Sequence, residues 1–147
     1  MEVINLDIDQ LTPYYNNAKK HPQEQIEQIK KSIKEFGMCD PIAVWGSDNT
    51  VVEGHGRLFA LDQLGIREIP CIRLDHLTDE QRKAYTLVHN QTTLNSGWDM
   101  EILGEELPDL FTDFDLGDYG FELGEAVEVV EATEVKPKLC PHCGGEL

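Results

Sequence analysis

The chain has 147 residues and a mass of 16.6 kDa, which is enough for one ordinary domain and a short appendage. Its 12 Lys and Arg residues against 28 Asp and Glu residues give a formal net charge of −16. That balance excludes a strongly basic surface that binds nucleic acid unaided. The charge is also uneven: residues 1–98 hold 10 bases and 14 acids, a balance of −4, whereas residues 99–147 hold 2 bases and 14 acids, a balance of −12.

No apolar run approaches the roughly 18–20 residues of a membrane span. The first residues, MEVINLDID, carry acids where a secretory signal has basic residues and an apolar stretch. We therefore expect a cytoplasmic protein without a membrane partner. Cys39 and Cys71 stand alone in apolar surroundings, and both are expected to be small buried side chains.

Strand and helix patterns alternate along the first half of the chain. Apolar and polar residues alternate over residues 3–8, which predicts a strand, and a loop rich in Asn and Pro follows at 11–22. Pro22 suits the first position of a helix, and Gly37 is a typical helix end. Between them, apolar residues spaced as on one helical face predict a stripe in the core: Ile26, Ile29, Ile33 and Phe36.

A β-hairpin is predicted next, from a short apolar strand at 41–45, turn residues at 46–49 and a returning strand at 50–54. A helix then begins near Arg57 and is closed by Gly65. Another strand follows at residues 69–74.

Two further helices are expected. Thr78 and Gln81 form a capping box before a helix that should bury Ala84, Leu87 and Val88. A short helix over residues 100–107 follows. This alternation indicates a small α/β or α+β domain over residues 1–100.

From about residue 108, acids are interleaved with scattered aromatic residues, which provide too little apolar surface for a separate core. We expect residues 101–135 to be an acidic, partly disordered extension. Its charge makes it a candidate docking arm for a basic protein.

The residues with the clearest chemical meaning are Glu53, Gly54, His55, Gly56 and Arg57. A strand, two glycines and a helix start would aim unpaired backbone N–H groups at one point, where a phosphate fits. Arg57 adds a fork of donors, and His55 can donate or carry a proton near neutral pH. Glu53 is a candidate catalytic base or magnesium-holding carboxylate. The alternative is an ordinary glycine turn with a surface arginine.

The sequence resembles the ParB/sulfiredoxin superfamily, specifically its ParB-like N-terminal domain, over about residues 3–99. The family's landmarks occur in family order in this chain. They are the N-x-x-x-H-P loop at 17–22, the helix at 24–37, Pro41-Ile42, the turn at 53–57, Leu64-Gly65, and the segment 77–91 with Gly97-Trp98-Asp99.

The resemblance implies a compact fold with a mixed sheet and packed helices, whose glycine turn binds the phosphates of a nucleotide. ATP, ADP or CTP, with magnesium, are the candidate ligands. By this resemblance, Gly54, His55, Gly56 and Arg57 form the phosphate-binding turn. Three further residues match positions beside the pocket: Asn17, His21 and Asn90.

Several departures limit what the resemblance implies. Chromosome-partitioning members read GERR where this chain has GHGR, and continue into a helix-turn-helix domain, whereas an acidic tail follows here. Their third motif ends in Gln-Arg, but Thr92 follows Gln91, which argues against a CTP-driven sliding clamp. Sulfiredoxins carry a catalytic Cys where His55 stands, so sulfinic-acid reduction is not expected. Free-serine kinases read Asp-Gly-His-His-Arg, which leaves phosphoryl transfer open.

Cys140 and Cys143 form a CxxC that looks like one knuckle of a zinc ribbon. The remaining ligands would come from a second chain, giving a zinc-bridged homodimer, or from a distant histidine. The alternative is a chain end with reduced thiols.

Three functions remain open. The first is a nucleotide-binding module of the phage or mobile-element type, which serves DNA segregation, modification or processing. It would contact DNA directly or through a partner such as a methyltransferase. The second is an enzyme, a nuclease or small-molecule phosphotransferase, in which Glu53 and His55 are catalytic. The third is a scaffold with a vestigial turn. His76 and His89 flank helix positions and are interpreted as ordinary histidines without a role in the site.

Overall fold

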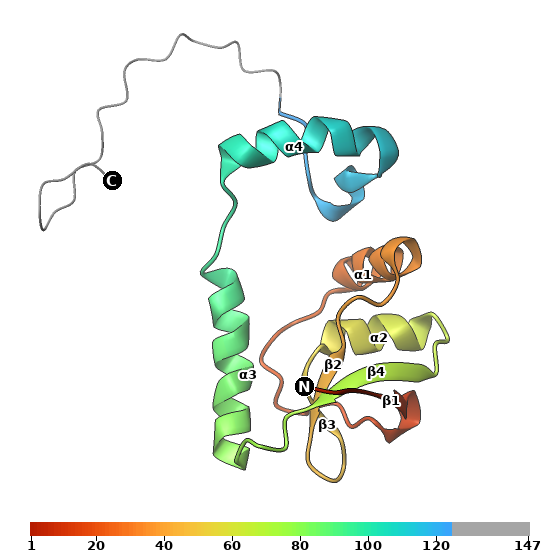
Figure 1. Cartoon of the computed structure of the whole chain (residues 1–147), viewed down its shortest axis with the longest axis vertical. Helices are drawn as coiled ribbons and strands as arrows, with labels where there is room; N and C mark the ends of the chain where they lie inside the picture. Colours follow the sequence, from red (N-terminus) through yellow and green to blue (C-terminus); the bar gives the residue numbers. More distant parts are fainter. Residues whose placement is uncertain (125–147) are drawn as a thin grey trace, which may run out of the picture. The chain divides into compact units, whose positions relative to one another are not determined.

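The computed structural model describes residues 1–124, which divide into one unit of residues 1–98 and a second that begins at Asp99. A four-stranded sheet organises the first unit (Figure 1). Its strands are β1 (Val3–Asp7), β2 (Ile42–Trp45), β3 (Thr50–Glu53) and β4 (Glu68–Arg73), in the order β1-β4-β2-β3. The β2–β4 pair is parallel and the other two pairs are antiparallel, so the sheet is mixed. The predicted α+β class with a mixed sheet is confirmed.

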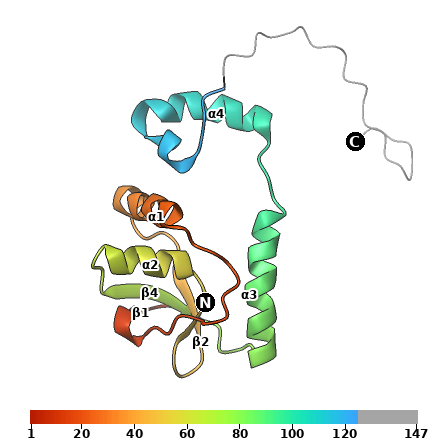
Figure 2. The same cartoon turned by 180° about the vertical axis from the view of Figure 1, so that it is seen from behind.

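Both faces of the central strands are apolar, because successive side chains of a strand point to opposite faces. On one face, Ile42 and Val44 pack with Val51 and with Leu58 of helix α2 (His55–Gln63) in the main core. On the other face, a smaller cluster is built around Ala43, Val52 and Leu74. Helices α1 (Gln23–Phe36) and α2 lie side by side over the main core (Figures 1 and 2).

The predicted β2–β3 hairpin is confirmed, and its register determines which residues neighbour the end of β3. Ala43 pairs with Glu53, so the residues that precede β2 lie beside the residues that follow β3. The turn is held by Arg73, whose guanidinium donates to Asn49 Oδ1 at 2.7 Å and to the Gly46 carbonyl at 2.6 Å. These bonds tie the hairpin to the end of β4.

Helix α1 ends as predicted at Gly37, which is its C-cap at φ +82°, but it begins at Gln23, so Pro22 is its N-cap and not its first residue. The predicted apolar stripe holds for Ile26, which is buried, but is wrong for Phe36, which is 51% exposed in the last turn. Cys39, in the loop after this helix, was expected to be buried but is also exposed. Ile33, about one turn before Phe36 in the helix, is partly buried and packs against the main core. The expected burial of Cys71 is confirmed.

Helix α3 (Asp79–Leu94) has the predicted capping box but a different buried face. Leu87 and Val88 are 59% and 57% exposed and Ala84 is exposed too, so the expected burial of these three residues is wrong. The side chains turned inward are those of Arg82 and Thr86, one helical turn apart.

A buried arginine explains how α3 packs against the rest of the domain. The Arg82 guanidinium lies 4.7 Å from the centre of the Tyr14 ring and 5.0 Å from that of Trp45. The Trp45 indole in turn donates to the Leu77 carbonyl at 2.9 Å. A cation between two aromatic faces replaces the aliphatic contact that the sequence pattern predicted.

The second unit contains helix α4 (Met100–Asp113), which Asp99 caps by accepting hydrogen bonds from two backbone N–H groups of the first turn. This helix continues through Pro108, beyond the expected 100–107, and is followed by the 3-10 helix η2 (Leu116–Tyr119). Within residues 1–124, no helix is both long and apolar enough to cross a membrane. The zinc prediction at Cys140 and Cys143 lies outside the described residues.

Candidate functional site

The turn between β3 and α2 depends on a glycine at position 54. Gly54 is the N-cap of α2 with φ +103° and ψ +22°, a conformation that residues with a Cβ rarely adopt. A Cβ there would lie 3.0 Å from Arg57 Nη2 and 3.1 Å from Ile42 Cγ1. Because this cap has no side chain, it makes no side-chain hydrogen bond to the first turn of α2. Unpaired amides at a helix start provide donors for an anion.

Gly56 has a different role, since it allows two helices to approach each other. A Cβ at Gly56 would lie 2.9 Å from His21 Nδ1 and 3.0 Å from Ile29 Cδ1. His21 precedes α1 and Ile29 belongs to it. The second glycine of the turn therefore permits the α1–α2 contact and brings His21 against the start of α2.

A pocket of about 290 Å³ opens at this turn. It is lined by the backbone and side chains of the β3–α2 turn, by the loop before α1, and by α3. All eight residues that the sequence predicted for the phosphate site line it: Asn17, His21, Glu53, Gly54, His55, Gly56, Arg57 and Asn90. The structure thus brings together residues that are up to 73 positions apart in the sequence, from Asn17 to Asn90.

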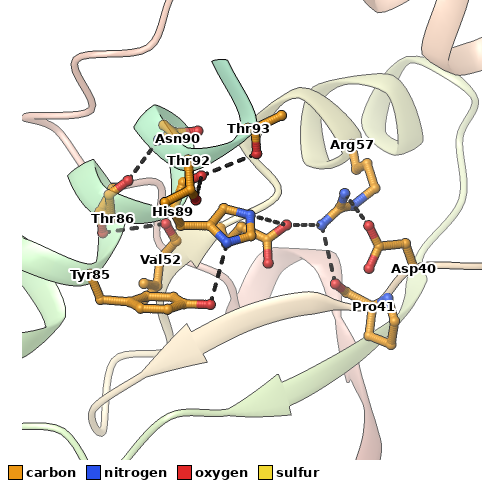
Figure 3. Close-up of polar contacts among 11 residues, drawn as sticks. Asp40, Pro41, Val52, Arg57, Tyr85, Thr86, His89, Asn90, Thr92 and Thr93 are labelled. Atoms are coloured by element: carbon orange, nitrogen blue, oxygen red, sulfur yellow. Dashed lines mark hydrogen bonds and ion pairs between the residues drawn. The ribbon is translucent and has the colours of Figure 1, made fainter. Parts of the chain in front are cut away.

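Arg57 is the central cation of this pocket, and two carboxylates hold it (Figure 3). Its Nη1 lies 2.6 Å from Asp40 Oδ2, and its Nη2 lies 2.7 Å from Glu53 Oε1. Nη2 also donates to the carbonyl of Pro41 at 3.3 Å. Its Nε is buried and has no hydrogen-bond partner among the described residues. The guanidinium is therefore fixed in place, and the two carboxylates together outweigh its single positive charge.

Glu53 links the arginine to helix α3. The oxygen that accepts from Arg57 also lies 3.6 Å from His89 Nε2. On the other side of that imidazole, Nδ1 lies 3.5 Å from the hydroxyl of Tyr85, and Figure 3 shows this ring beside His89. Glu53 is about 21% exposed, so its carboxylate reaches the pocket while two neighbours orient it.

His55 is in a different environment from the one expected of a proton carrier. Its side chain is almost fully enclosed, with the residue 4% exposed, and Nε2 accepts a hydrogen bond from the backbone N–H of Tyr14 at 3.1 Å. Burial, and to a lesser degree the nearby charge of His21, lowers the pKa of His55 to about 4. The ring is therefore neutral near pH 7 and ties the loop before α1 to the start of α2. This favours a positioning role over proton transfer near neutral pH.

The other three predicted residues are held by local hydrogen bonds. Nδ1 of His21 is paired with Gln25 Oε1 at 2.9 Å. Asn17 Oδ1 accepts from the backbone N–H of Lys19 at 3.3 Å. The Asn90 amide donates to the Thr86 carbonyl, one turn back in α3, at 2.8 Å. Such bonds orient the amide and imidazole groups at the pocket wall before any ligand arrives.

Sequence reasoning missed two residues that matter at the site, Asp40 and His89. The hairpin register could have found Asp40, because Ala43 pairs with Glu53 and antiparallel pairing brings the residues just before β2 alongside those just after β3. The helical repeat could have indicated His89, since both His89 and Asn90 lie about one turn before Thr93 in α3. His89 and Thr93 both line the pocket beside Asn90.

Within residues 1–124, no group of three or more His, Cys, Asp or Glu side chains is placed to hold a metal ion. A magnesium ion at this pocket would rest on Glu53 and Asp40, whose carboxylates are both engaged by Arg57. Such an ion would share its ligands with the guanidinium.

Comparisons with known proteins agree with this architecture. Residues 1–91 match the family model described as the ParB N-terminal domain. The ParB-like nuclease domain-containing protein YnaK of Escherichia coli strain K12 is 35% identical over 83 residues, which cover 56% of this chain and 94% of YnaK. The probable chromosome-partitioning protein ParB of Campylobacter jejuni is 32% identical over 88 residues, which are 58% of this chain and 31% of that protein.

Among solved structures, the C-terminally truncated ParB of Caulobacter crescentus superposes with a TM-score of 0.60 at 18% sequence identity, covering 76% of this chain and 66% of that one. The chain therefore spans only about a third of the Campylobacter protein and about two thirds of the solved Caulobacter chain. The family match covers more than half of the present sequence and includes every residue of the pocket except Thr93. This chain belongs to the ParB N-terminal domain family.

Proposed function

We propose that residues 1–98 bind a nucleotide through its phosphates in the pocket at the β3–α2 turn. The observation that carries the proposal is the convergence of the uncapped start of α2 with the Arg57 guanidinium on one pocket of about 290 Å³. Helix N-termini and arginine forks both favour the oxygens of a phosphate. A pocket of that volume has room for more than an inorganic ion.

The ligand class is supported by the family. The Caulobacter ParB was solved in complex with CTP-γ-S. By analogy, CTP is one candidate for this chain, and ATP and ADP are the others. Asn17 and Asn90 line the same pocket and present amides. We assign them to polar parts of the nucleotide beyond the phosphates, with Lys19 as a further cation at the pocket wall.

The wider role that we propose is in DNA transactions, as an accessory protein of phage or mobile-element type. The net charge of −4 over residues 1–98 and the high acidity of the remainder favour action through a partner, such as a methyltransferase, over direct contact with DNA. The acidic segment after the domain would then recruit a basic protein.

A second candidate function is phosphoryl transfer or phosphodiester cleavage. The contact between Glu53 and His89 favours it, because a carboxylate beside an imidazole in a phosphate pocket can orient a nucleophile. The catalytic role that the sequence suggested for His55 would have to act without a change in its protonation near neutral pH, because its pKa is lowered to about 4.

Titration calorimetry would test the proposal. ATP, ADP, CTP and GTP, each with magnesium, are titrated into the wild-type protein, Arg57→Ala and Arg67→Ala. Arg67 is an exposed arginine that pairs with Asp7 and Asp9 outside the pocket, so its loss changes the net charge by the same amount. We expect binding of at least one nucleotide by the wild type and by Arg67→Ala, and at least a tenfold loss in Arg57→Ala.

Phosphate release separates the two candidate functions. Binding without release of phosphate supports the module, whereas release that Glu53→Gln abolishes supports the enzyme. If none of the four nucleotides binds the wild-type protein, both candidates are rejected and the scaffold interpretation takes their place.

A further inference from the structure

The two acids that hold Arg57 differ in how firmly the fold holds them. The Asp40 side chain is 66% exposed and belongs to the loop between α1 and β2. The Glu53 side chain is 21% exposed and stands at the end of β3, where it also lies beside His89. Glu53 is thus a built-in part of the pocket wall, whereas Asp40 meets Arg57 from the solvent side.

The two acids also determine the local charge. Arg57 carries one positive charge, and Asp40 and Glu53 together carry two negative charges within 2.7 Å of it. The cluster therefore has a net charge of −1 before any ligand arrives. A phosphate that approaches this arrangement meets a carboxylate already bonded to Nη1, and like charges repel at such distances.

We propose that Asp40 is an internal competitor for the ligand, occupying the Arg57 donor that a phosphate oxygen takes when a nucleotide binds. This inference rests on the proposed function. On binding, the phosphate oxygen replaces Asp40 Oδ2 at Nη1, and the displaced carboxylate moves into solvent. Glu53 and the carbonyl of Pro41 stay on Nη2, so the guanidinium keeps its orientation during the exchange.

This exchange assigns different tasks to the two carboxylates. Glu53 positions the arginine, and its loss should weaken binding. Asp40 lowers the affinity for phosphate, and removal of its charge should strengthen binding. An exposed ion pair of this kind is worth roughly a two- to fivefold change in an equilibrium constant, so Asp40→Asn should bind about two- to fivefold more tightly than the wild type.

The test compares Asp40→Asn, Asp40→Glu and Asp62→Asn with the wild type by calorimetric titration of ADP, CTP and inorganic pyrophosphate. Asp62 is an exposed acid of α2 that does not line the pocket, so its variant changes the net charge equally without touching Arg57. The titrations are run first in EDTA, so that no metal ion bridges the ligand to the acids, and are then repeated with magnesium. Circular dichroism spectra verify that all the variants are folded.

We expect tighter binding in Asp40→Asn, little change in Asp62→Asn, and affinity near that of the wild type in Asp40→Glu, which restores the charge. The advantage of Asp40→Asn should also shrink as salt is added, because screening weakens the competing ion pair. Binding by the wild type with equal affinities for Asp40→Asn and Asp62→Asn overturns this inference and leaves the proposed function standing. Absence of binding in every variant, with and without magnesium, overturns both.

Discussion

Replacement of Gly54 by alanine tests whether the turn before α2 is built as described. Two effects should add at this position. The backbone has φ +103°, which disfavours any residue with a Cβ, and the new Cβ would press on Ile42 Cγ1 at 3.1 Å and on Arg57 Nη2 at 3.0 Å. Gly65→Ala provides a matched control, because Gly65 has φ +72° but no atom of the described part of the chain within 4 Å of an added Cβ.

The expected magnitudes follow from these two terms. A left-handed backbone costs an L-residue roughly 1–2 kcal/mol, so Gly65→Ala should lower the free energy of unfolding by about that amount. At Gly54 the backbone cost is the same, and crowding by the new Cβ adds about 1–3 kcal/mol. The crowded neighbours cannot easily move, since Ile42 is fully buried and Arg57 is held by two acids. Gly54→Ala should therefore lose about 2–5 kcal/mol.

Equilibrium unfolding in urea, followed by tryptophan fluorescence and far-UV circular dichroism, measures both losses. Trp98 is exposed in the folded state, so the fluorescence change on unfolding reports mainly on Trp45 in the sheet. Equal losses for the two variants would refute the crowding at Gly54. A smaller loss for Gly54→Ala than for Gly65→Ala would refute the described turn altogether.

Three further predictions follow from burial and charge. Arg82→Lys should lower the free energy of unfolding in urea by about 1–2 kcal/mol, because an ammonium does not stack between the Tyr14 and Trp45 rings. As a control, Lys83→Arg at an exposed position of the same helix should change it by less than about 0.5 kcal/mol. Burial raises the pKa of Cys71 to about 11, so at pH 8 iodoacetamide should label Cys39 and spare Cys71 in peptide maps of the folded protein; labelling of Cys71 at the rate of Cys39 would contradict this. The pKa of His55 is lowered to about 4 in the folded protein, so between pH 8 and pH 5 this histidine takes up a proton in the unfolded chain but not in the folded one. The free energy of unfolding should therefore fall by about 2 kcal/mol from pH 8 to pH 5, and His55→Gln should remove this pH dependence.

Most of the fold could be predicted from local patterns. Alternation over residues 3–8, turn residues at 46–49 and the glycine at position 65 each predicted a boundary that the structure confirms. These signals are local, because backbone conformation at turns and helix ends depends on the residues present there. The capping box of Thr78 and Gln81 is confirmed for the same reason.

Local patterns did not predict which face of α3 is buried. Periodicity locates an apolar stripe, but it does not say whether that stripe faces the sheet or solvent. In this helix the sheet is met by Arg82, whose charge is accommodated between Tyr14 and Trp45, residues far from it in sequence. A cation enclosed by aromatic rings looks, in a linear pattern, like an exposed polar residue. The apolar residues Leu87 and Val88 were therefore assigned to the wrong side.

At the candidate site, too, some features could be predicted from the sequence and others could not. The positions that line the pocket were predicted, because family order placed them, but their partners were not. Arg57 was expected as a free fork of donors, and the structure pairs it with Asp40 and Glu53. Ion pairs of this kind depend on strand register and on side-chain direction, which a motif does not contain. The contact of His89 with Glu53 depends on the packing of α3 against β3.

The glycine turn itself now supports the proposed function less directly than its sequence suggested. Gly54 is required by a backbone angle, Gly56 by the approach of His21, and His55 by its bond to the Tyr14 amide. Each of these has a structural reason to be present whether or not a ligand binds. Arg57 is different, because its buried Nε has no hydrogen-bond partner among residues 1–124 and because two acids pair with its guanidinium. A fold that needed only a turn would not require a cation at this position, so the nucleotide hypothesis depends on Arg57 and on the two acids that pair with it.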